Sequence, residues 1–432
     1  MIIIERLVSE FKNLNLRNKP KKEKKSIKHI TIVNQFFPPD FAATGQLLNE
    51  LSDGLAEESD FHIRVLTGWP SYAYQSEPKT KIEKHKNKTI VRSNTSRIWP
   101  KKIGGRLVNS VLFSLKIGFN LLNPRKNDDL IIYTTEPPFL SFVALIINFL
   151  KKKPFILILY DLYPDVISKL NYLNGLNFII EFWNKINAIS YDKAKNIIVL
   201  SESMKANLVN KYPSLRNKIS IIPSWVDHKK IKPLAKNKNW FIEKYNLRNK
   251  FVVLYSGNQG RCHDLVTLID SAKILKSDSS IIFIFIGNGP QNKRIKDLIL
   301  DSELRNCLLL PYQKLENLPF TLSCADLATV SLNKNAEGLI APSKLYGHLS
   351  AGTPIAAISP IDSYLRKVIE NQKCGKWFKN GESLELAHWI IELQSNKSLH
   401  KKYSHNARNY ILREVTFDKI KNQYLKIINS SF

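Results

Sequence analysis

The chain has 432 residues, of which 44% are hydrophobic, and a formal net charge of +28 at pH 7. This length exceeds the size at which one hydrophobic core stops growing, so the sequence predicts two domains. The charge favours anionic partners such as acidic lipids or phosphorylated small molecules, although a lysine-rich composition explains it equally well, and the sequence shows no focused basic stripe typical of nucleic-acid binding.

Residues 1–27 are predicted to form a basic N-terminal extension. Ile2, Ile3, Leu7 and Phe11 fall near helical spacing and precede a lysine-rich tail. This pattern suits either a helix on a membrane surface or a disordered extension. It is not typical of a signal peptide, because neither a long apolar run nor a small-residue cleavage site follows.

From Lys28 onwards, apolar strands alternate with helices. A helix is expected over 44–57, and strands are expected at 29–35, 61–67, 89–93, 130–135, 154–160 and 196–201. Apolar strands separated by helices predict a parallel sheet that is covered on both faces. The apolar run 139–150 is too short to cross a bilayer, so we expect a buried helix, with an interfacial helix as the alternative. We assign 28–222 to a first Rossmann-like domain.

The same alternation restarts after a lysine- and proline-containing stretch. We expect this stretch, 223–249, to be a linker, and 250–415 to form a second Rossmann-like domain. Strands are expected at 251–257, 281–289, 307–312, 327–332 and 354–359, and later helices at 382–393, 398–413 and 416–428. Ligands of such α/β domains bind at the carboxyl ends of the strands. The fold class is therefore α/β, with two doubly wound domains facing across a cleft.

A glycine-containing loop follows the first strand of the second domain. Gly257 and Gly260 lie directly after the strand, with Arg261 and His263 beside them. Glycines let a backbone approach phosphate, and the next helix presents free N–H groups. An ordinary tight turn is the alternative, because every strand-to-helix connection needs one.

The next strand ends in the sequence Gly-Asn-Gly-Pro, 287–290. Its glycines, Gly287 and Gly289, would allow close approach to a nucleotide base. The alternative is a plain turn before a helix that begins near Pro290.

The stretch EGLIAPSKLYGHLSAGTP, 337–354, places a lysine where a helix dipole disfavours positive charge. Pro342 suits the first helical position, which leaves Ser343 and Lys344 in the first turn among free backbone donors. A diphosphate bound there would receive N–H groups, a hydroxyl and an ammonium together. We therefore predict a diphosphate site at this helix start.

Three loops in the first half also end strands. They contain Thr44 and Gly45 at a helix start, Glu136 in TTEPPF, and Asp161 in LYDLYPDVI. A buried, unpaired Asp161 would be costly, so a partner or ligand is expected, whereas Asp165 is predicted to cap a helix.

Several other kinds of site are not indicated by the sequence. The chain has no Gly-x-Ser-x-Gly, Walker or Asp-x-Asp motif and no Cys-x-x-Cys pair. These absences argue against acyl hydrolases, ATPases, metal-dependent sugar transferases and zinc sites.

From about residue 28, the order and spacing of six segments resembles glycosyltransferase family 4, which has the GT-B fold. The segments are NQFFPPDFAATGQL, YDLYPDV, IIPSWVD, YSGNQGRCHDL, FIGNGP and PSKLYGHLSAGTPI. The resemblance is closest to L-fucosamine or colanic-acid-type transferases of bacterial surface polysaccharides. It implies retaining sugar transfer from a nucleotide-sugar, without metal or cofactor. The second domain would bind the donor and the first the acceptor, with helix 416–432 packing back on the first domain.

The resemblance also implies roles for individual residues. The catalytic candidates are Asp161, Lys344 and Arg261, and the acceptor-side candidates are Thr44, Gly45 and Glu136. The donor-binding candidates are Gly257, Asn258, Gly260, His263, Gly287, Gly289, Glu337, Gly338, Leu339, Pro342 and Ser343. Relatives carry two glutamates eight residues apart, but here these positions fall on Leu339 and Gly347. Glu337 could take the first position only if the alignment were shifted by two residues. The usual Arg and Lys of the phosphate loop fall on Asn258 and His263.

The expected donor is a UDP-sugar, and the expected acceptor is a polyprenyl-diphosphate-linked or nascent glycan. The enzyme would act in the cytoplasm, peripherally at the inner face of the plasma membrane and in contact with anionic lipid, and it would not bind nucleic acid. The alternatives are a sugar-nucleotide epimerase of the same fold and a catalytically inactive, nucleotide-sugar-binding component of a polysaccharide assembly complex.

Overall fold

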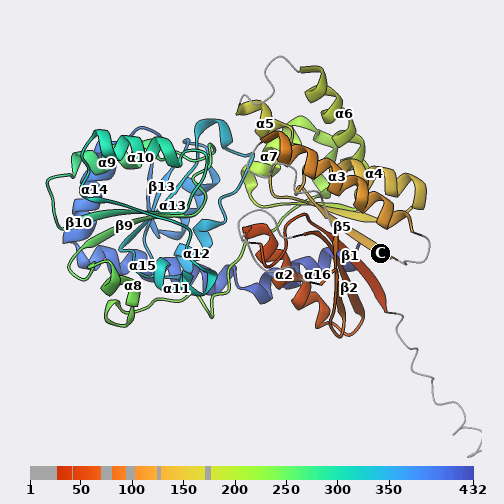
Figure 1. Cartoon of the computed structure of the whole chain (residues 1–432), viewed down its shortest axis with the longest axis horizontal. Coiled ribbons are helices and arrows are strands. Elements are labelled where there is room, and N and C mark those ends of the chain that lie inside the picture. Colours follow the sequence, from red (N-terminus) through yellow and green to blue (C-terminus); the bar gives the residue numbers. More distant parts are fainter. Residues whose placement is uncertain (1–26, 41, 70–79, 94–102, 124–127, 171–176) are drawn as a thin grey trace, which may run out of the picture.

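Two mainly parallel sheets, each covered by helices, make up the chain (Figure 1). The computed structural model describes residues 27–40, 42–69, 80–93, 103–123, 128–170 and 177–432. The predicted N-terminal extension, including its possible membrane helix, lies outside the described residues except for Ile27.

The described part of the first sheet has the strand order β3-β4-β2-β1-β5-β6-β7-β8. Its strands are β1 (Lys28–Val33), β2 (Phe61–Gly68), β3 (Ile82–Lys84), β4 (Lys88–Ser93), β5 (Leu130–Thr134), β6 (Phe155–Leu159), β7 (Asn196–Val199) and β8 (Ile219–Ile221). Strands such as β6, with the sequence FILIL, are buried throughout, as expected of a sheet covered on both faces. Only β3 pairs antiparallel in this sheet as described.

Helices cover both faces of the first sheet. In Figure 1, α3, α4 and α6 lie on one face, and α2 with the C-terminal helix α16 lies on the other. The bounds are α2 (Ala43–Ala56), α3 (Ile103–Leu122), α4 (Leu140–Lys151), α5 (Asp165–Lys169), α6 (Asn177–Lys193) and α7 (Glu202–Lys211). The helix predicted over 139–150 is α4, but it is buried along one side only, through residues such as Leu140 and Ile147, and exposes Phe149.

The second sheet has the strand order β11-β10-β9-β12-β13-β14. Its strands are β9 (Phe251–Ser256), β10 (Ile281–Ile286), β11 (Cys307–Leu310), β12 (Leu327–Ser331), β13 (Ile355–Ile358) and β14 (Gly375–Phe378). Its helices are α8 (Trp240–Lys244), α9 (Val266–Ile274), α10 (Asn292–Asp301), α11 (Leu318–Leu322), α12 (Lys344–Ser350), α13 (Tyr364–Gln372), α14 (Ser383–Ser395) and α15 (Lys397–Glu414). Part of the predicted linker 223–249 packs into this domain, because Phe241 and Ile242 of α8 are fully buried in a cluster with Val252 of β9.

The last helix, α16 (Phe417–Asn429), returns to the first domain and lies against α2. A Cβ atom on Gly54 would come within 2.6 Å of the Phe417 ring, so the glycine permits this approach. The Trp225 ring lies 6.1 Å from the Phe417 ring, and its Nε1 donates to Glu50 Oε2 at 2.9 Å. Apolar and polar contacts thus tie the chain end to the first domain.

Candidate active site

The loops that follow β6 and β12 meet where the two domains join. Asp161 and Ile340 form an isolated antiparallel bridge, and Leu162 N donates to Leu339 O at 2.9 Å. Because parallel strands end at the same edge of a sheet, the other ligand loops of each domain converge on this region, which we call the domain junction.

The two predicted glycine loops of the second domain are hydrogen-bonded to each other. Gln259 N donates to Asn288 O at 2.9 Å, and Gln291 Nε2 donates to Gly260 O at 2.6 Å. Gly257 and Gly287 have φ values of +132° and +131°, and a Cβ on Gly287 would lie 2.1 Å from Gly257 O. A side chain is therefore excluded at Gly287, and the two loops form one rigid wall.

Asn258, Gly260 and Gly289 complete this wall. A Cβ on Gly289 would lie 2.6 Å from Asn258 Oδ1, and one on Gly260 would lie 3.2 Å from Asn258 Nδ2. The Asn258 carbonyl accepts a hydrogen bond from the Tyr255 hydroxyl at 2.6 Å. The Asn258 side chain thus fills the space beside two glycines.

Lys344 lies against this wall. Its Nζ donates to the Tyr255 hydroxyl at 2.6 Å and lies 4.1 Å from the centre of the Tyr255 ring. A Cβ on Gly257 would lie 3.3 Å from Lys344 Cε, so the glycine leaves room for the lysine. Burial lowers the pKa of Lys344 to about 7. Among the described residues, no carboxylate forms an ion pair with it, so a half-buried cation is left without a counter-charge there.

Two buried histidines accompany Lys344. The His263 Nδ1 lies 2.7 Å from Ser331 O and must donate to it, which leaves Nε2 as an acceptor 3.4 Å from Lys344 Nζ. His348, one turn after Lys344 in α12, is fully buried, and its ring nitrogens have no hydrogen-bond partner in the described part of the chain. Burial, reinforced by the Lys344 charge, lowers the pKa of each histidine to about 3, so both are neutral.

The helix after β12 begins later than the sequence predicts. Pro342 was expected at the first helical position, but α12 starts at Lys344, and Ser343 is its N-cap without a side-chain capping bond. The chain enters from the Ile340 bridge and makes tight turns in which Leu345 N donates to Pro342 O and Tyr346 N to Ser343 O. Pro342 therefore fits the turn before the helix, and Lys344 occupies the first helical position. The Ser343 hydroxyl takes no part in capping.

Glu337, Gly338 and Leu339 contact the first domain instead of surrounding Lys344. A Cβ on Gly338, whose φ is +68°, would lie 2.3 Å from Asn207 Nδ2 of α7. Leu339 is buried and accepts the hydrogen bond from Leu162. Glu337 Oε1 accepts from Tyr364 N at 3.3 Å, and burial raises the pKa of Glu337. These residues hold the domains together.

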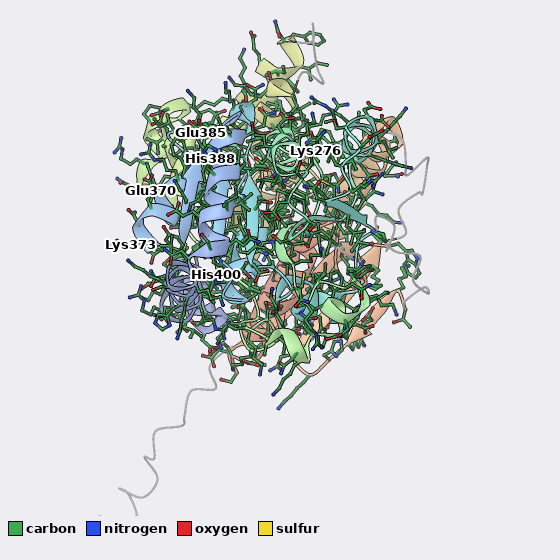
Figure 2. All side chains as sticks on the ribbon, turned by 90° about the vertical axis from the view of Figure 1, so that its left-hand side faces the viewer. Lys276, Glu370, Lys373, Glu385, His388 and His400 are labelled. Carbon is green, nitrogen blue, oxygen red and sulfur yellow. The ribbon has the colours of Figure 1, made fainter. Side chains whose placement is uncertain are left out.

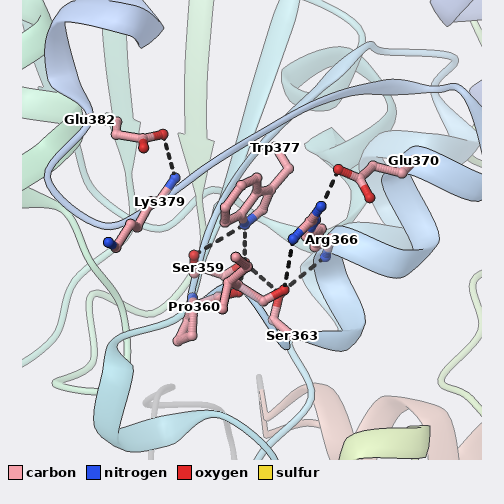
Figure 3. A network of polar contacts seen from close by, with 9 residues as sticks. Ser359, Pro360, Ser363, Arg366, Glu370, Trp377, Lys379 and Glu382 are labelled. Carbon is pink, nitrogen blue, oxygen red and sulfur yellow. Dashed lines mark hydrogen bonds and ion pairs between the residues drawn. The ribbon is translucent and has the colours of Figure 1, made fainter.

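A polar network fixes the start of α13, to which Glu337 is bonded (Figure 3). Trp377 Nε1 donates to the Ser359 carbonyl at 3.1 Å, and the Ser359 and Ser363 hydroxyls are 2.6 Å apart. Ser363 caps the helix by accepting from Arg366 N, and the Arg366 guanidinium lies 4.5 Å from the Trp377 ring. The network holds the start of α13 in place, and with it the Tyr364 N–H that donates to Glu337.

Gly347 occupies the position at which members of the family that the sequence resembles carry their second glutamate. A Cβ on Gly347 would lie 3.1 Å from Leu322 Cδ1. The apolar Leu322 side chain thus crowds the space into which a longer side chain at this position would extend.

Arg261 is exposed and lines a cavity of about 350 Å³ between the domains. Lys169 at the end of α5 and Arg294 of α10 line the same cavity. The remaining lining residues are Leu170, Pro290, Gln291, Asn333 and Asn335. Three cations therefore surround a space large enough for a polar group of a substrate.

The first domain brings two carboxyl groups to the junction. Thr44 in the first turn of α2 donates its hydroxyl to Glu136 Oε2, and burial together with the nearby Asp161 charge raises the pKa of Glu136 to about 7. Asp161 Oδ2 accepts from the Tyr163 hydroxyl at 3.3 Å, and burial raises the pKa of Asp161 to about 6. A Cβ on Gly45 would lie 2.9 Å from Phe36 O, so Gly45 lets α2 start close to the loop after β1.

The two sides of the junction interact electrostatically. Burial and the Asp161 charge both raise the pKa of Cys262, which follows Arg261 in the glycine loop of the second domain. Sequence reasoning did not identify Cys262, Tyr163, Tyr255 or His348 as part of the site. No motif marks them, and only their positions next to strand ends or one turn from Lys344 could have suggested them. Asp165 does not cap α5 but pairs with Lys211 at 2.6 Å.

The described residues include neither a metal-binding cluster nor a membrane-spanning helix. Within the described ranges, no group of three or more His, Cys, Asp or Glu side chains is arranged to hold a metal ion. No helix in those ranges is both long and apolar enough to span a bilayer.

Comparison with known proteins agrees with this architecture. Residues 236–410 match the family described as glycosyl transferases group 1. The chain is 22% identical over 302 residues to WbjE, a probable glycosyltransferase of Pseudomonas aeruginosa, covering 70% of this chain and 74% of the relative. It is 29% identical over 159 residues to WcaI of Escherichia coli K12, a putative colanic acid biosynthesis glycosyl transferase, covering 36% and 39%.

Solved structures share the fold over most of the chain. Sucrose-phosphate synthase from Thermosynechococcus elongatus superposes with a TM-score of 0.73 at 14% identity, covering 93% of this chain and 98% of that one. HepE from Anabaena, in complex with UDP and glucose, superposes with a TM-score of 0.68 at 14% identity, covering 93% and 100%. The predicted GT-B architecture of two Rossmann-like domains is confirmed.

Proposed function

The chain is a glycosyltransferase of the GT-B fold whose C-terminal domain matches group 1, and we propose that it transfers a sugar from a UDP-sugar to a polyprenyl-diphosphate-linked or nascent glycan in bacterial surface polysaccharide synthesis. The proposed reaction retains the anomeric configuration and uses neither metal nor cofactor. The family match and the relatives WbjE and WcaI support the reaction class, and WcaI supports an L-fucosamine or colanic-acid-type branch. The complex of HepE with UDP supports a UDP-sugar as donor.

The observation that carries this proposal is the half-buried Lys344 ammonium. It faces the rigid glycine wall at Gly257 and has no carboxylate partner in the described part of the chain. A diphosphate beside it would supply the missing negative charge, and backbone N–H groups of the glycine loops and of the start of α12 would supply further donors. Such fixed donors stabilise the charge that develops on a departing diphosphate.

The carboxyl groups of the first domain fit the acceptor side of the reaction. The acceptor hydroxyl oxygen forms the new bond to the anomeric carbon on the face from which the diphosphate leaves, so the configuration is retained, while the bond from that carbon to the diphosphate oxygen breaks. The electron pair of the broken bond stays on the diphosphate, beside Lys344. Asp161, whose pKa of about 6 leaves it mostly ionised at pH 7, accepts the hydroxyl proton. Thr44 and Glu136 would hold the acceptor through hydrogen bonds.

The cavity lined by Lys169, Arg261 and Arg294 suits an anionic group on the acceptor. Three cations at one open space favour a diphosphate, such as that of a polyprenyl carrier, over a neutral sugar. In this proposal Arg261 binds the acceptor carrier, while Lys344 serves the donor. An acceptor on a lipid carrier places the enzyme peripherally at the cytoplasmic face of the membrane.

The experiment combines donor binding with transfer. A thermal-shift panel of UDP, GDP, ADP and TDP should raise the unfolding midpoint most with UDP, because a ligand bound only by the folded state stabilises it. Labelled UDP-sugar should then transfer label to a polyprenyl-diphosphate glycan acceptor. Turnover of the UDP-sugar without an acceptor would favour a GT-B epimerase. UDP binding without any turnover would favour an inactive binding component, the alternative that Gly347 motivates.

A further inference from the structure

The outer surface of the first domain is apolar along three neighbouring helices. On α3 the exposed residues Leu107, Val111, Leu115 and Phe119 recur every fourth position and so share one side of the helix. Phe119 is 73% exposed, and Phe149 on α4 is 72% exposed. On α6, Phe178, Phe182 and Ile189 are exposed. We call this surface the α3–α4–α6 face.

This exposure is unusual for a helix that covers a sheet. The opposite side of α3 buries Phe113, Ile117 and Leu121 in the core, so the helix is apolar on both sides. A surface helix normally carries polar residues on its solvent side, and a helix that is apolar all round is normally covered. Large contiguous apolar patches on soluble proteins mark interaction sites.

The three helices form one continuous surface. α3 packs on α4 where Val143 lies 4.0 Å from the Cβ position of Gly118, and α4 packs on α6 where the Phe139 and Trp183 rings stack at 5.0 Å. The second domain differs. Its side, shown in Figure 2, presents polar residues: Glu370 on α13, Lys373 directly after that helix, and Glu385 and His388 on α14. The apolar surface is therefore a local feature of the first domain.

The charges around the α3–α4–α6 face are mostly positive. The sequences of α3 and α4 contain no Asp or Glu, whereas Lys116 is exposed on α3 and Lys151–Lys153 end α4. Lys152 Nζ lies 5.4 Å from the Phe149 ring, so an ammonium stands beside the apolar residues. On α6, Lys185 and Lys193 are exposed, as are Glu181 and Asp192, and Asp192 forms ion pairs with Lys193 and Lys218. Apolar side chains bordered by lysines complement acyl chains beneath anionic headgroups.

We propose that the α3–α4–α6 face docks on an anionic bilayer, with its apolar side chains among the acyl chains and its lysines among the headgroups. This inference deepens the proposed function and rests on it for the lipid-linked acceptor. Lys169, which lines the interdomain cavity, lies at the end of α5, and α6 is the next described helix. The cationic cavity and the α3–α4–α6 face thus involve consecutive described helices of the first domain.

The test is sedimentation of the full chain with vesicles of phosphatidylglycerol and phosphatidylcholine, and with vesicles of phosphatidylcholine alone. The patch variant Leu115→Gln/Phe119→Gln/Phe149→Gln is compared with a matched control, Leu300→Gln/Leu384→Gln/Leu412→Gln, which changes exposed leucines of the second domain. We expect the patch variant to bind anionic vesicles at least about tenfold more weakly than wild type. The control should bind like wild type, and wild type should prefer anionic vesicles by about tenfold.

Two further measurements separate this inference from the proposed function. Transfer to a short-chain, water-soluble acceptor should be unchanged in the patch variant, which also shows that the variant folds. Wild-type binding by the patch variant would overturn the docking face, whatever the transfer result. Vesicle binding as expected without transfer to any acceptor would support the docking face and refute the proposed function. Light scattering that shows a wild-type dimer, a monomeric patch variant and no vesicle binding would assign the face to a second copy and overturn the inference.

Discussion

The two sides of the domain junction carry titratable groups of opposite charge, and burial disfavours the charged form of both. The second domain presents an ammonium, Lys344, among neutral rings and backbone dipoles. The first domain presents two carboxyl groups, Glu136 and Asp161, and the Asp161 charge opposes the ionisation of Glu136. Burial lowers the pKa of Lys344 to about 7 and raises those of Glu136 and Asp161 to about 7 and 6.

The difference between the sides indicates what each one lacks. Lys344 lacks an anion, which a donor diphosphate would supply in the proposed function. Glu136 and Asp161 each accept one hydroxyl hydrogen bond, from Thr44 and Tyr163, and an acceptor hydroxyl would supply a further one. Perturbed pKa values of this kind cluster at functional sites, because a catalytic group must be able to change its charge at neutral pH. Substitutions on the two sides should therefore affect different substrates.

The largest effect is expected for Lys344→Met. Removing the ammonium takes away one fixed stabiliser of the departing diphosphate, so kcat/KM for the donor should fall by on the order of 100-fold, or about 2–3 kcal/mol. Steady-state kinetics with labelled UDP-sugar measures this loss. Lys334→Ala, which removes an exposed lysine shortly before α12, is the matched control and should retain wild-type kinetics. Near-wild-type turnover by Lys344→Met would refute the diphosphate assignment.

On the other side of the junction, Asp161→Asn should reduce kcat by tens of fold, on the order expected when a general base is lost. The Kd for UDP should stay within about twofold, because Asp161 belongs to the acceptor side. Asp165→Asn on α5, which breaks only the exposed pair with Lys211, is the control. Unchanged kcat in Asp161→Asn would make this residue a structural one.

The sequence was sufficient to predict most of the fold. The last four residues of β1, ITIV, and all of β6, FILIL, are uninterrupted runs of apolar and β-branched residues, so their burial follows from composition. The sequence did not reveal β3, β8 and β14, which are three or four residues long and carry polar residues. Short strands at the end of a sheet take their conformation from the neighbouring strand, so no local pattern marks them.

The candidate site was only partly predictable. Lys344 was identified because a lysine at a helix start is locally unusual, and Gly257 because a second glycine and the polar residues Arg261 and His263 accompany it after the strand. The sequence could not show that Leu339 and Gly338 contact the first domain, because that depends on how closely α7 approaches. Nor could it show that Arg261 faces the interdomain cavity and not Lys344. Residue spacing encodes local structure, whereas the meeting of two domains depends on contacts far apart in the chain.

A smaller effect should appear in the pH dependence of UDP binding. Lys344 is protonated below its pKa of about 7 and loses its charge above it, while a bound diphosphate favours the charged form. Affinity should therefore be highest below pH 7 and should weaken by about tenfold between pH 7 and 8.5. His263 and His348, with pKa values of about 3, stay neutral throughout this range. Calorimetric titration measures the Kd, and Lys344→Met should show only the titration of the nucleotide itself. An equal pH dependence in both proteins would exclude Lys344 as the titrating group.

The smallest expected effect is on the free energy of unfolding, because the burial of Glu136 destabilises the fold when this carboxyl group ionises. Because its pKa is raised from 4.5 to about 7, the folded state binds this proton more tightly than the unfolded state. The stabilisation from the proton is fully present below pH 4.5 and is lost as the pH rises through 7. Glu136→Gln keeps an acceptor for the Thr44 hydroxyl but cannot ionise. It should therefore raise the free energy of unfolding by on the order of 1 kcal/mol at pH 8 and leave it nearly unchanged at pH 4.5.

Urea unfolding at both pH values measures the difference, with the exposed Glu392→Gln as control. A Glu136→Gln protein that is more stable at pH 8 but slower with acceptor would show that this carboxyl group is retained for function at the expense of stability. An equal effect of Glu136→Gln on the free energy of unfolding at both pH values would show that the pKa of Glu136 is not raised in the folded protein.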